Sequence, residues 1–293
     1  PRYIVDYMVS SNQVPVMTQS DSVLRLGPNA YSKPATALNI LRETIMGREL
    51  FDFAFKEYSR RWEFKRPTPS DFFRTMEEAS GIDLDWFWRG WFYTTDHVDI
   101  SLERVYQMEM NTENPDIDFA REREDDKAFS PSLFSERNRD AGMRTWVERN
   151  TDVRDFYDEN DEFTVTNKER NAYNSFLEGL EDWEREALDK AVSEERNYYL
   201  VEFANKGDLV MPIILDVEYA DGATDQIRYP AEIWRKSPKM VKKLLVTERE
   251  IVSLTIDPSM ETADADLENN FYPRRLVPSR IESFKSSSSS RRV

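Results

Sequence analysis

The sequence predicts an α+β protein, with helices in its first hundred residues and strands after residue 196. Two patterns lead to this fold class. Apolar residues recur at helical spacing between Pro34 and Tyr93, whereas Ile213–Tyr219 alternates apolar and charged residues with the period of a half-exposed strand. Between these parts, residues 111–170 carry 17 Asp and Glu and 10 Lys and Arg with few apolar residues. That composition indicates a solvated connector or insertion with short helices, whose order stays open.

The first predicted helix begins at Pro34 and ends at Gly47. Proline suits the first helical position because its φ is fixed and it has no N–H to leave unpaired, and glycine is common just past a helix end. Residues 1–30 have no clear period and read mostly as loop, with a short helix near Tyr3–Val9. A second helix follows around Phe51–Tyr58.

Two further helices complete this part. One begins after Thr68, which can cap it together with an acidic residue three positions on, and runs to Gly81. The other, Leu84–Tyr93, follows a capping Asp83 and carries aromatic residues nearly all round. We expect this helix to be buried and its tryptophans to pack in the core.

The second half of the chain is predicted to be helical until about Glu195 and then strand-rich. A helix is expected at Ala172–Glu195. Strands are expected at Tyr198–Ala204, Ile213–Tyr219, Thr224–Tyr229 and Ile251–Ile256, with Asp221-Gly222 as a hairpin turn. These strands would form a small antiparallel sheet or sandwich.

Four regions follow from these patterns. They are a helical part at 1–105, an acidic connector with helices at 106–196, a β-rich C-terminal domain at 197–262 and a low-complexity tail at 263–293.

Composition excludes several classes of function. A formal charge of −16 repels phosphate backbones, so we expect no nucleic-acid partner. No apolar run reaches the roughly 18 residues of a membrane-spanning helix. The chain has no cysteine and a single histidine, His97, which we interpret as a loop residue. Cysteine nucleophiles and thiolate metal sites are therefore ruled out.

One long stretch resembles a known family. Residues from about Ala30 to Ile100 are similar to the helical second half of the thermolysin-like catalytic domain in aminopeptidase N-like gluzincin zinc metallopeptidases, peptidase family M1. Four features in fixed order carry this resemblance: Tyr-x-Lys before a helix, the stretch GRELF, the helix start PTPSDFF with ASGIDLDWF, and the exit WFY. The later segment, from LVMPIILDVEYADGATDQIRYPAEIWR through DPSMETADADLENNFYPRR, is similar to the β domain that follows in bacterial relatives.

The resemblance implies a site of which this chain holds one part. The family binds zinc through H-E-x-x-H and a later glutamate, a motif that one histidine cannot make. A missing N-terminal half would then hold the zinc of the complete protein, and this chain would bind no zinc. Tyr31 matches the family's tyrosine, whose hydroxyl hydrogen-bonds the oxyanion during peptide hydrolysis. Pro34 stands where the family usually has glycine, so a packing role for Tyr31 stays open, and we interpret Lys33 as solvated or ion-paired.

The resulting hypothesis is that the chain is part of a zinc-dependent aminopeptidase, which hydrolyses N-terminal residues from peptide substrates. This chain alone would be inactive. The alternative is a non-catalytic binding or scaffold member of the same fold, favoured by the acidic 111–170 region; an unrelated two-domain protein is a third reading. The fragment hypothesis predicts an exposed apolar surface around Leu38–Ile45 and Trp86–Phe92, where the missing half would dock. Localisation stays open, although bacterial relatives with this type of β domain are often periplasmic or secreted.

Overall fold

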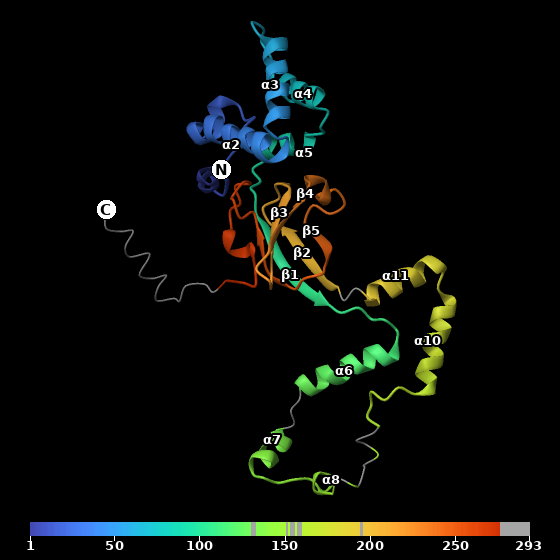
Figure 1. The fold of residues 1–293 in the computed structure, drawn as a ribbon. Helices are drawn as coiled ribbons and strands as arrows, with labels where there is room; N and C mark the ends of the chain where they lie inside the picture. The colour runs from blue at the N-terminus through green and yellow to red at the C-terminus, as the bar shows by residue number, and fades with distance from the viewer. Residues whose placement is uncertain (130–132, 151, 153–155, 157–159, 194–195, 276–293) are drawn as a thin grey trace. The chain divides into compact units, whose positions relative to one another are not determined.

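The protein is α+β, as a computed structural model of the chain shows (Figure 1). The structure describes residues 1–129, 133–150, 152, 156, 160–193 and 196–275. By internal contacts the chain divides into two compact units. Unit 1 combines Pro1–Gln107 with the chain from Tyr198 on, and unit 2 is Met108–Asn197. Each unit is described by itself.

Apart from short 3₁₀ turns such as η6 (Ala231–Trp234), the helical elements of unit 1 lie in its first hundred residues, as predicted. They are the 3₁₀ turn η1 (Arg2–Ile4), α1 (Val5–Met8), the 3₁₀ turn η2 (Ser20–Ser22), the π-helical turn η3 (Pro28–Ser32), α2 (Lys33–Ile40), the π-helical turn η4 (Leu41–Ile45), α3 (Arg48–Trp62), α4 (Pro69–Ser80), α5 (Asp85–Trp88) and the π-helical turn η5 (Arg89–Tyr93). The short helix expected near Tyr3–Val9 is confirmed by η1 and α1.

Capping residues and glycines in the sequence mark the ends of α3 and α4. Thr68 and Asp71 form a reciprocal capping box at the start of α4, and Gly81 ends that helix in the left-handed conformation at φ +71°. Gly47, at φ +80°, separates η4 from α3.

One predicted helix start is wrong. The helix expected from Pro34 begins six residues earlier, because η3 starts at Pro28 and runs without a break into α2. Pro28 therefore takes the role assigned to Pro34, since both prolines fit a helical first turn. As a result, Tyr31 lies within the helix and not ahead of it.

The helical part is packed around its aromatic residues. Phe87 and Trp91 are fully buried, and the Trp88 ring stacks on Phe73 at 4.5 Å between centroids. The prediction of an exposed apolar surface around Leu38–Ile45 and Trp86–Phe92 is wrong: most of these side chains are buried in this chain's own core, among them Ile40, Leu41, Phe87, Trp88, Trp91 and Phe92.

Unit 1 also contains two sheets. The strands are β1 (Ile100–Met108), β2 (Asn197–Asn205), β3 (Ile213–Tyr219), β4 (Thr224–Tyr229), β5 (Met240–Thr247), β6 (Ile251–Ile256) and β7 (Phe271–Tyr272). The first sheet has the order β1-β2-β5 and the second β4-β3-β6-β7. In the second sheet all pairs are antiparallel, with Leu215 opposite Ile256, and the predicted Asp221-Gly222 hairpin joins β3 to β4. The helices and both sheets contribute to one hydrophobic core.

Three strands lie outside the predicted set. β1 and β5 were not predicted, and β7, with the 3₁₀ turn η7 (Leu267–Asn269), lies in the region 263–293 predicted as tail. That prediction is therefore wrong for residues 267–272. The serine-rich part of the predicted tail lies outside the described residues. Because β1 and β2 are neighbours, residues 108–197 form an insertion between adjacent strands of one sheet (Figure 1).

The segment that joins the helices to β1 is held by backbone contacts. His97 N donates to Gly207 O at 3.0 Å, and Leu209 N donates to His97 O at 3.2 Å. At Gly207 a Cβ would lie 2.2 Å from His97 O, so only glycine permits this approach. His97 lies outside the named helices and strands, as predicted, and forms an isolated bridge with Asp208.

Unit 2 is a set of helices that covers almost the same residues as the predicted connector. They are α6 (Pro115–Phe129), α7 (Leu133–Asp140), α8 (Trp146–Arg149), α10 (Asn167–Gly179) and α11 (Asp182–Ser193). The prediction of a single helix at Ala172–Glu195 is wrong, because α10 ends at Gly179 and the backbone of Leu180 is extended. Glu195 lies outside the described residues.

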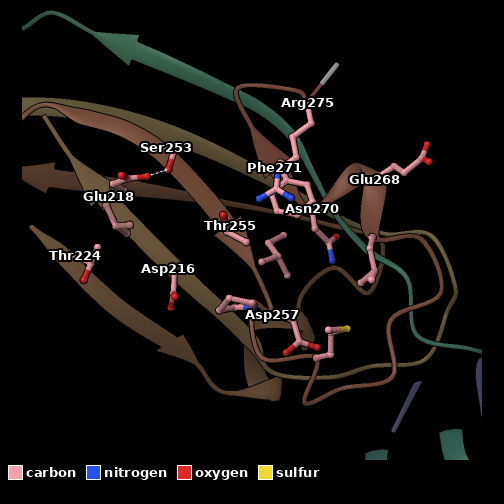
Figure 2. A pocket seen from close by; sticks show the side chains of 15 residues that line it. Asp216, Glu218, Thr224, Ser253, Thr255, Asp257, Glu268, Asn270, Phe271 and Arg275 are labelled. Carbon is pink, nitrogen blue, oxygen red and sulfur yellow. Dashed lines mark hydrogen bonds between the residues drawn. The ribbon is translucent and has the colours of Figure 1, made fainter. Parts of the chain in front are cut away.

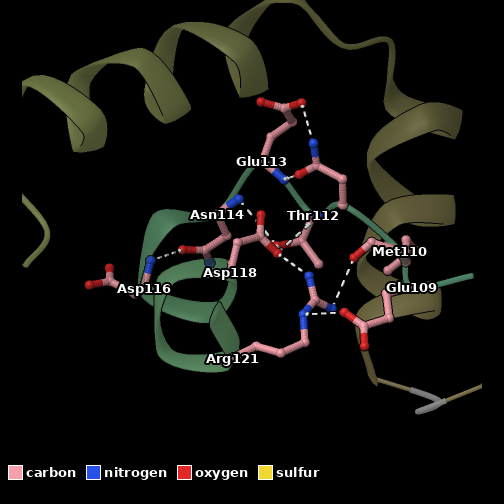
Figure 3. A network of polar contacts seen from close by, with 9 residues as sticks. Glu109, Met110, Thr112, Glu113, Asn114, Asp116, Asp118 and Arg121 are labelled. Atoms are coloured by element: carbon pink, nitrogen blue, oxygen red, sulfur yellow. Dashed lines mark hydrogen bonds and ion pairs between the residues drawn. The ribbon is translucent and has the colours of Figure 1, made fainter. Parts of the chain in front are cut away.

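Specific polar contacts order the start of this unit (Figure 3). Asp118 Oδ1 accepts hydrogen bonds from Thr112 Oγ1 at 3.0 Å and from Arg121 Nη2 at 3.1 Å. Arg121 also pairs with Glu109 through Nε at 3.1 Å and donates to Met110 O at 3.2 Å. The acidic region is therefore ordered here by side chains that satisfy one another.

In the part of the chain that the structure describes, no helix has both the length and the apolar character needed to cross a membrane.

Candidate functional site

The sequence-predicted site residue, Tyr31, lies in the π-helical turn η3. Its side chain is 72% exposed, and its hydroxyl makes no hydrogen bond to any residue that the structure describes. A free phenol can donate a hydrogen bond to an oxygen that gains negative charge.

The residues two positions before and after Tyr31 are buried. Asn29 is 1% exposed and Lys33 is 0% exposed. Since side chains two residues apart point to nearly opposite sides of a helix, burial of both neighbours directs Tyr31 outward. The helix thus carries an exposed phenol between two buried polar side chains.

Asn29 ties the start of the helix to the N-terminal segment. Its Nδ2 donates to Tyr7 Oη at 3.0 Å and to Val14 O at 2.8 Å. The buried amide therefore finds acceptors on two different parts of the chain, which fixes the position of the turn.

Lys33 makes a second anchor on the other side. Its Nζ donates to Gln13 Oε1 at 2.8 Å and to Thr94 O at 3.3 Å. Gln13 Nε2 in turn donates to Met8 O and Thr95 O, so one network joins α1, α2 and the end of η5.

The environment of Lys33 disfavours its charge. Burial lowers the pKa of Lys33 to about 8, and the negative charge of Asp96 offsets only part of this effect. Our interpretation of Lys33 as solvated or ion-paired is therefore wrong. The reason is the earlier helix start, which places Lys33 on the inner face of a continuous helix.

The residues of this chain do not fit a zinc site of the aminopeptidase kind. The sequence has one histidine and no cysteine, and the one group of three carboxylates found among the described residues, Glu77, Asp83 and Asp85, contains no imidazole. Two of these carboxylates have a structural role: Glu77 Oε1 accepts from Leu84 N at 3.0 Å, and Asp83 Oδ1 accepts from Asp85 N at 3.2 Å. They therefore satisfy backbone N–H groups at the start of α5.

Comparison with known proteins gives little further information. No protein-family model matches the chain, and no curated protein matches it. Among solved structures, aminopeptidase A of Legionella pneumophila, in complex with aspartic acid, is similar at 13% identity with a TM-score of 0.34. The alignment covers 90% of this chain and 19% of that one, so the chain spans about a fifth of its length. At this level of similarity the match assigns neither fold nor activity.

Proposed function

We propose that this chain is part of an aminopeptidase and that Tyr31 donates a hydrogen bond to the oxyanion formed during peptide hydrolysis. In this proposal the chain supplies a phenol and the packing that positions it. Zinc, and the groups that bind it, would come from residues outside this sequence, because none of the histidine and glutamate motif is present here.

The observation that carries the proposal is the exposure of the Tyr31 side chain between two buried neighbours. A tyrosine held only for packing would bury its ring, whereas this one is 72% exposed between two buried anchors. The ordered set of four motifs between Ala30 and Ile100 supports the same assignment. Fixed positioning matters because a donor stabilises a transition state only if it is already aimed when charge develops.

The test is Tyr31→Phe in the protein expressed from the complete reading frame. The change removes one hydroxyl and keeps the ring, so turnover should fall about 10²- to 10³-fold while zinc content stays the same. Tyr93→Phe is the matched control, because Tyr93 is also exposed and lies in the same helical part. Equal rates for Tyr31→Phe and the parent protein would remove Tyr31 from the mechanism.

A second candidate is a non-catalytic binding module. It is favoured by unit 2, where Phe134, Trp146 and Trp183 are exposed on helices of an acidic segment. Exposed aromatic residues of this kind are typical of protein contacts. If the complete protein held no stoichiometric metal and cleaved no aminoacyl reporter, this function would replace the first.

A further inference from the structure

A hollow lies on the second sheet of unit 1, away from Tyr31 in sequence (Figure 2). It has a volume of about 640 Å³ and is lined by β3, β4, β6, the segment that follows β6 from Asp257 to Met260, and the segment from η7 to Arg275. The side chains that project into it from the strands are mainly carboxylates and hydroxyls, among them Asp216, Glu218, Ser253 and Thr255. The hollow therefore offers mostly hydrogen-bond acceptors.

Three of the lining carboxylates are not in a close ion pair. Asp216 Oδ1 accepts from Gln226 Nε2 at 2.8 Å and Glu218 Oε2 accepts from Ser253 Oγ at 2.7 Å, while Glu268 is exposed at the rim. None of the three forms an ion pair with a lysine or arginine of the described residues. The four lining carboxylates, Asp216, Glu218, Asp257 and Glu268, therefore outnumber the one guanidinium group of the lining, that of Arg275, although the charge of Arg228 also acts on Asp216.

The side-chain oxygen of a buried amide in the wall also lacks a partner. Asn270 is 1% exposed and its side chain is directed into the hollow (Figure 2). Its Nδ2 donates to Asp264 Oδ2 at 3.3 Å, but its Oδ1 has no hydrogen-bond partner among the described residues. Buried acceptors are normally satisfied, so this oxygen is an acceptor left open to a donor such as an ordered water or a bound group.

One wall already holds a guanidinium group. Arg275 places its guanidinium carbon 3.3 Å from the centre of the Phe271 ring, and both residues line the hollow (Figure 2). A planar guanidinium stacks well on an aromatic face, whereas an ammonium group does so less well. Phe271 therefore forms a surface suited to arginine.

We propose that this hollow binds the arginine side chain of a peptide partner. The guanidinium would stack on Phe271 and donate to Asp216 or Glu218, whose carboxylates match its fork of N–H groups. Arg275 occupies the same ring face and acts as an internal competitor. Arginine suits the site better than lysine because the site combines an aromatic face with planar acceptors. This inference does not depend on the peptidase assignment.

Binding of a dye-labelled Gly-Arg-Gly peptide to the full chain, measured by fluorescence anisotropy at low salt, tests the proposal. Peptides with citrulline or lysine in place of arginine are the comparison probes. The arginine peptide should bind at least about tenfold more tightly than the citrulline peptide, because citrulline keeps the shape and loses the charge.

The variants separate this site from general attraction to a protein of charge −16. Glu218→Gln should weaken binding about tenfold, and Arg275→Gln should tighten it about threefold by freeing the Phe271 face. The matched controls are Glu250→Gln and Lys236→Gln, which make the same charge changes at exposed positions outside the hollow. Both should leave the affinity unchanged.

Three results would overturn the proposal. They are equal binding of the arginine and citrulline peptides, equal losses for Glu218→Gln and Glu250→Gln, and lysine binding as tight as arginine binding. The first result would show that the hollow does not recognise the guanidinium group. The second would show that binding depends on the net charge of the protein alone. The third would show unspecific cation binding in place of arginine recognition.

Discussion

Replacement of Lys33 by methionine tests the buried network that positions the Tyr31 helix. Methionine fills a similar volume and cannot be charged, so the variant lacks the cost of burying an ammonium group. The pKa of Lys33 is about 8, against 10.5 for an ordinary lysine. At roughly 1.4 kcal/mol per pKa unit, the difference corresponds to about 3 to 4 kcal/mol.

The sign of the pH dependence follows from proton binding. Because the pKa is lower in the folded chain, the unfolded chain binds more protons between pH 8 and pH 10.5. The contribution of Lys33 to stability is therefore present above pH 10.5 and is lost as the pH falls through 8. As the pH rises across this window, the free energy of unfolding of the parent chain, relative to Lys33→Met, should rise by about 3 to 4 kcal/mol.

Urea unfolding followed by tryptophan fluorescence measures this difference, since Trp88 and Trp91 are buried in the same helical part. Lys56→Met is the control, because Lys56 is exposed on α3 and its loss should not alter the pH profile. Parallel profiles for the parent chain and Lys33→Met between pH 8 and pH 10.5 would refute the lowered pKa of the buried Lys33.

Two further predictions concern stability in unit 1. Burial raises the pKa of Asp264 from 3.8 to about 7, so its neutral form is favoured by folding. As the pH rises from 3.8 to 7, the parent chain should lose about 4 kcal/mol of unfolding free energy relative to Asp264→Asn; urea titrations that give the same pH profile for both would contradict this. Gly207→Ala should cost about 3 kcal/mol or more, because its Cβ would lie 2.2 Å from His97 O. Gly27→Ala, with no atom within 4 Å of the new Cβ, is the control, and equal urea midpoints for the two variants would disprove the contact.

Local signals predicted much of the fold. The capping box at Thr68 and the left-handed Gly81 mark α4 correctly, because both act within a few residues of the helix end. The alternation in Ile213–Tyr219 identified β3 for the same reason. The aromatic residues of Leu84–Tyr93 indicated burial, and their packing in the core confirms it.

The missed strands have weaker patterns. β1 is buried only at its first residues and is then charged and half-exposed, so its sequence does not alternate cleanly. β5 exposes Met240 and carries two adjacent lysines, which obscures the period of two. Such strands are defined by their neighbours in the sheet more than by their own sequence.

The candidate site was predictable only in part. Tyr31 could be selected because a motif surrounds it, but its exposure depends on the helix start at Pro28. The anchoring of Lys33 could not be predicted, since its partners Gln13 and Thr94 are 20 and 61 residues away in sequence. No local pattern reports a hydrogen bond between segments so far apart.

Hydrolysis of an aminoacyl reporter by the protein from the complete reading frame, before and after removal of zinc by a chelator, tests the central claim most directly. The proposed aminopeptidase should release the reporter, lose this activity on chelation and recover it when zinc is returned. Absence of hydrolysis above the blank, or a rate that chelation does not change, would contradict the assignment of this chain to a zinc aminopeptidase.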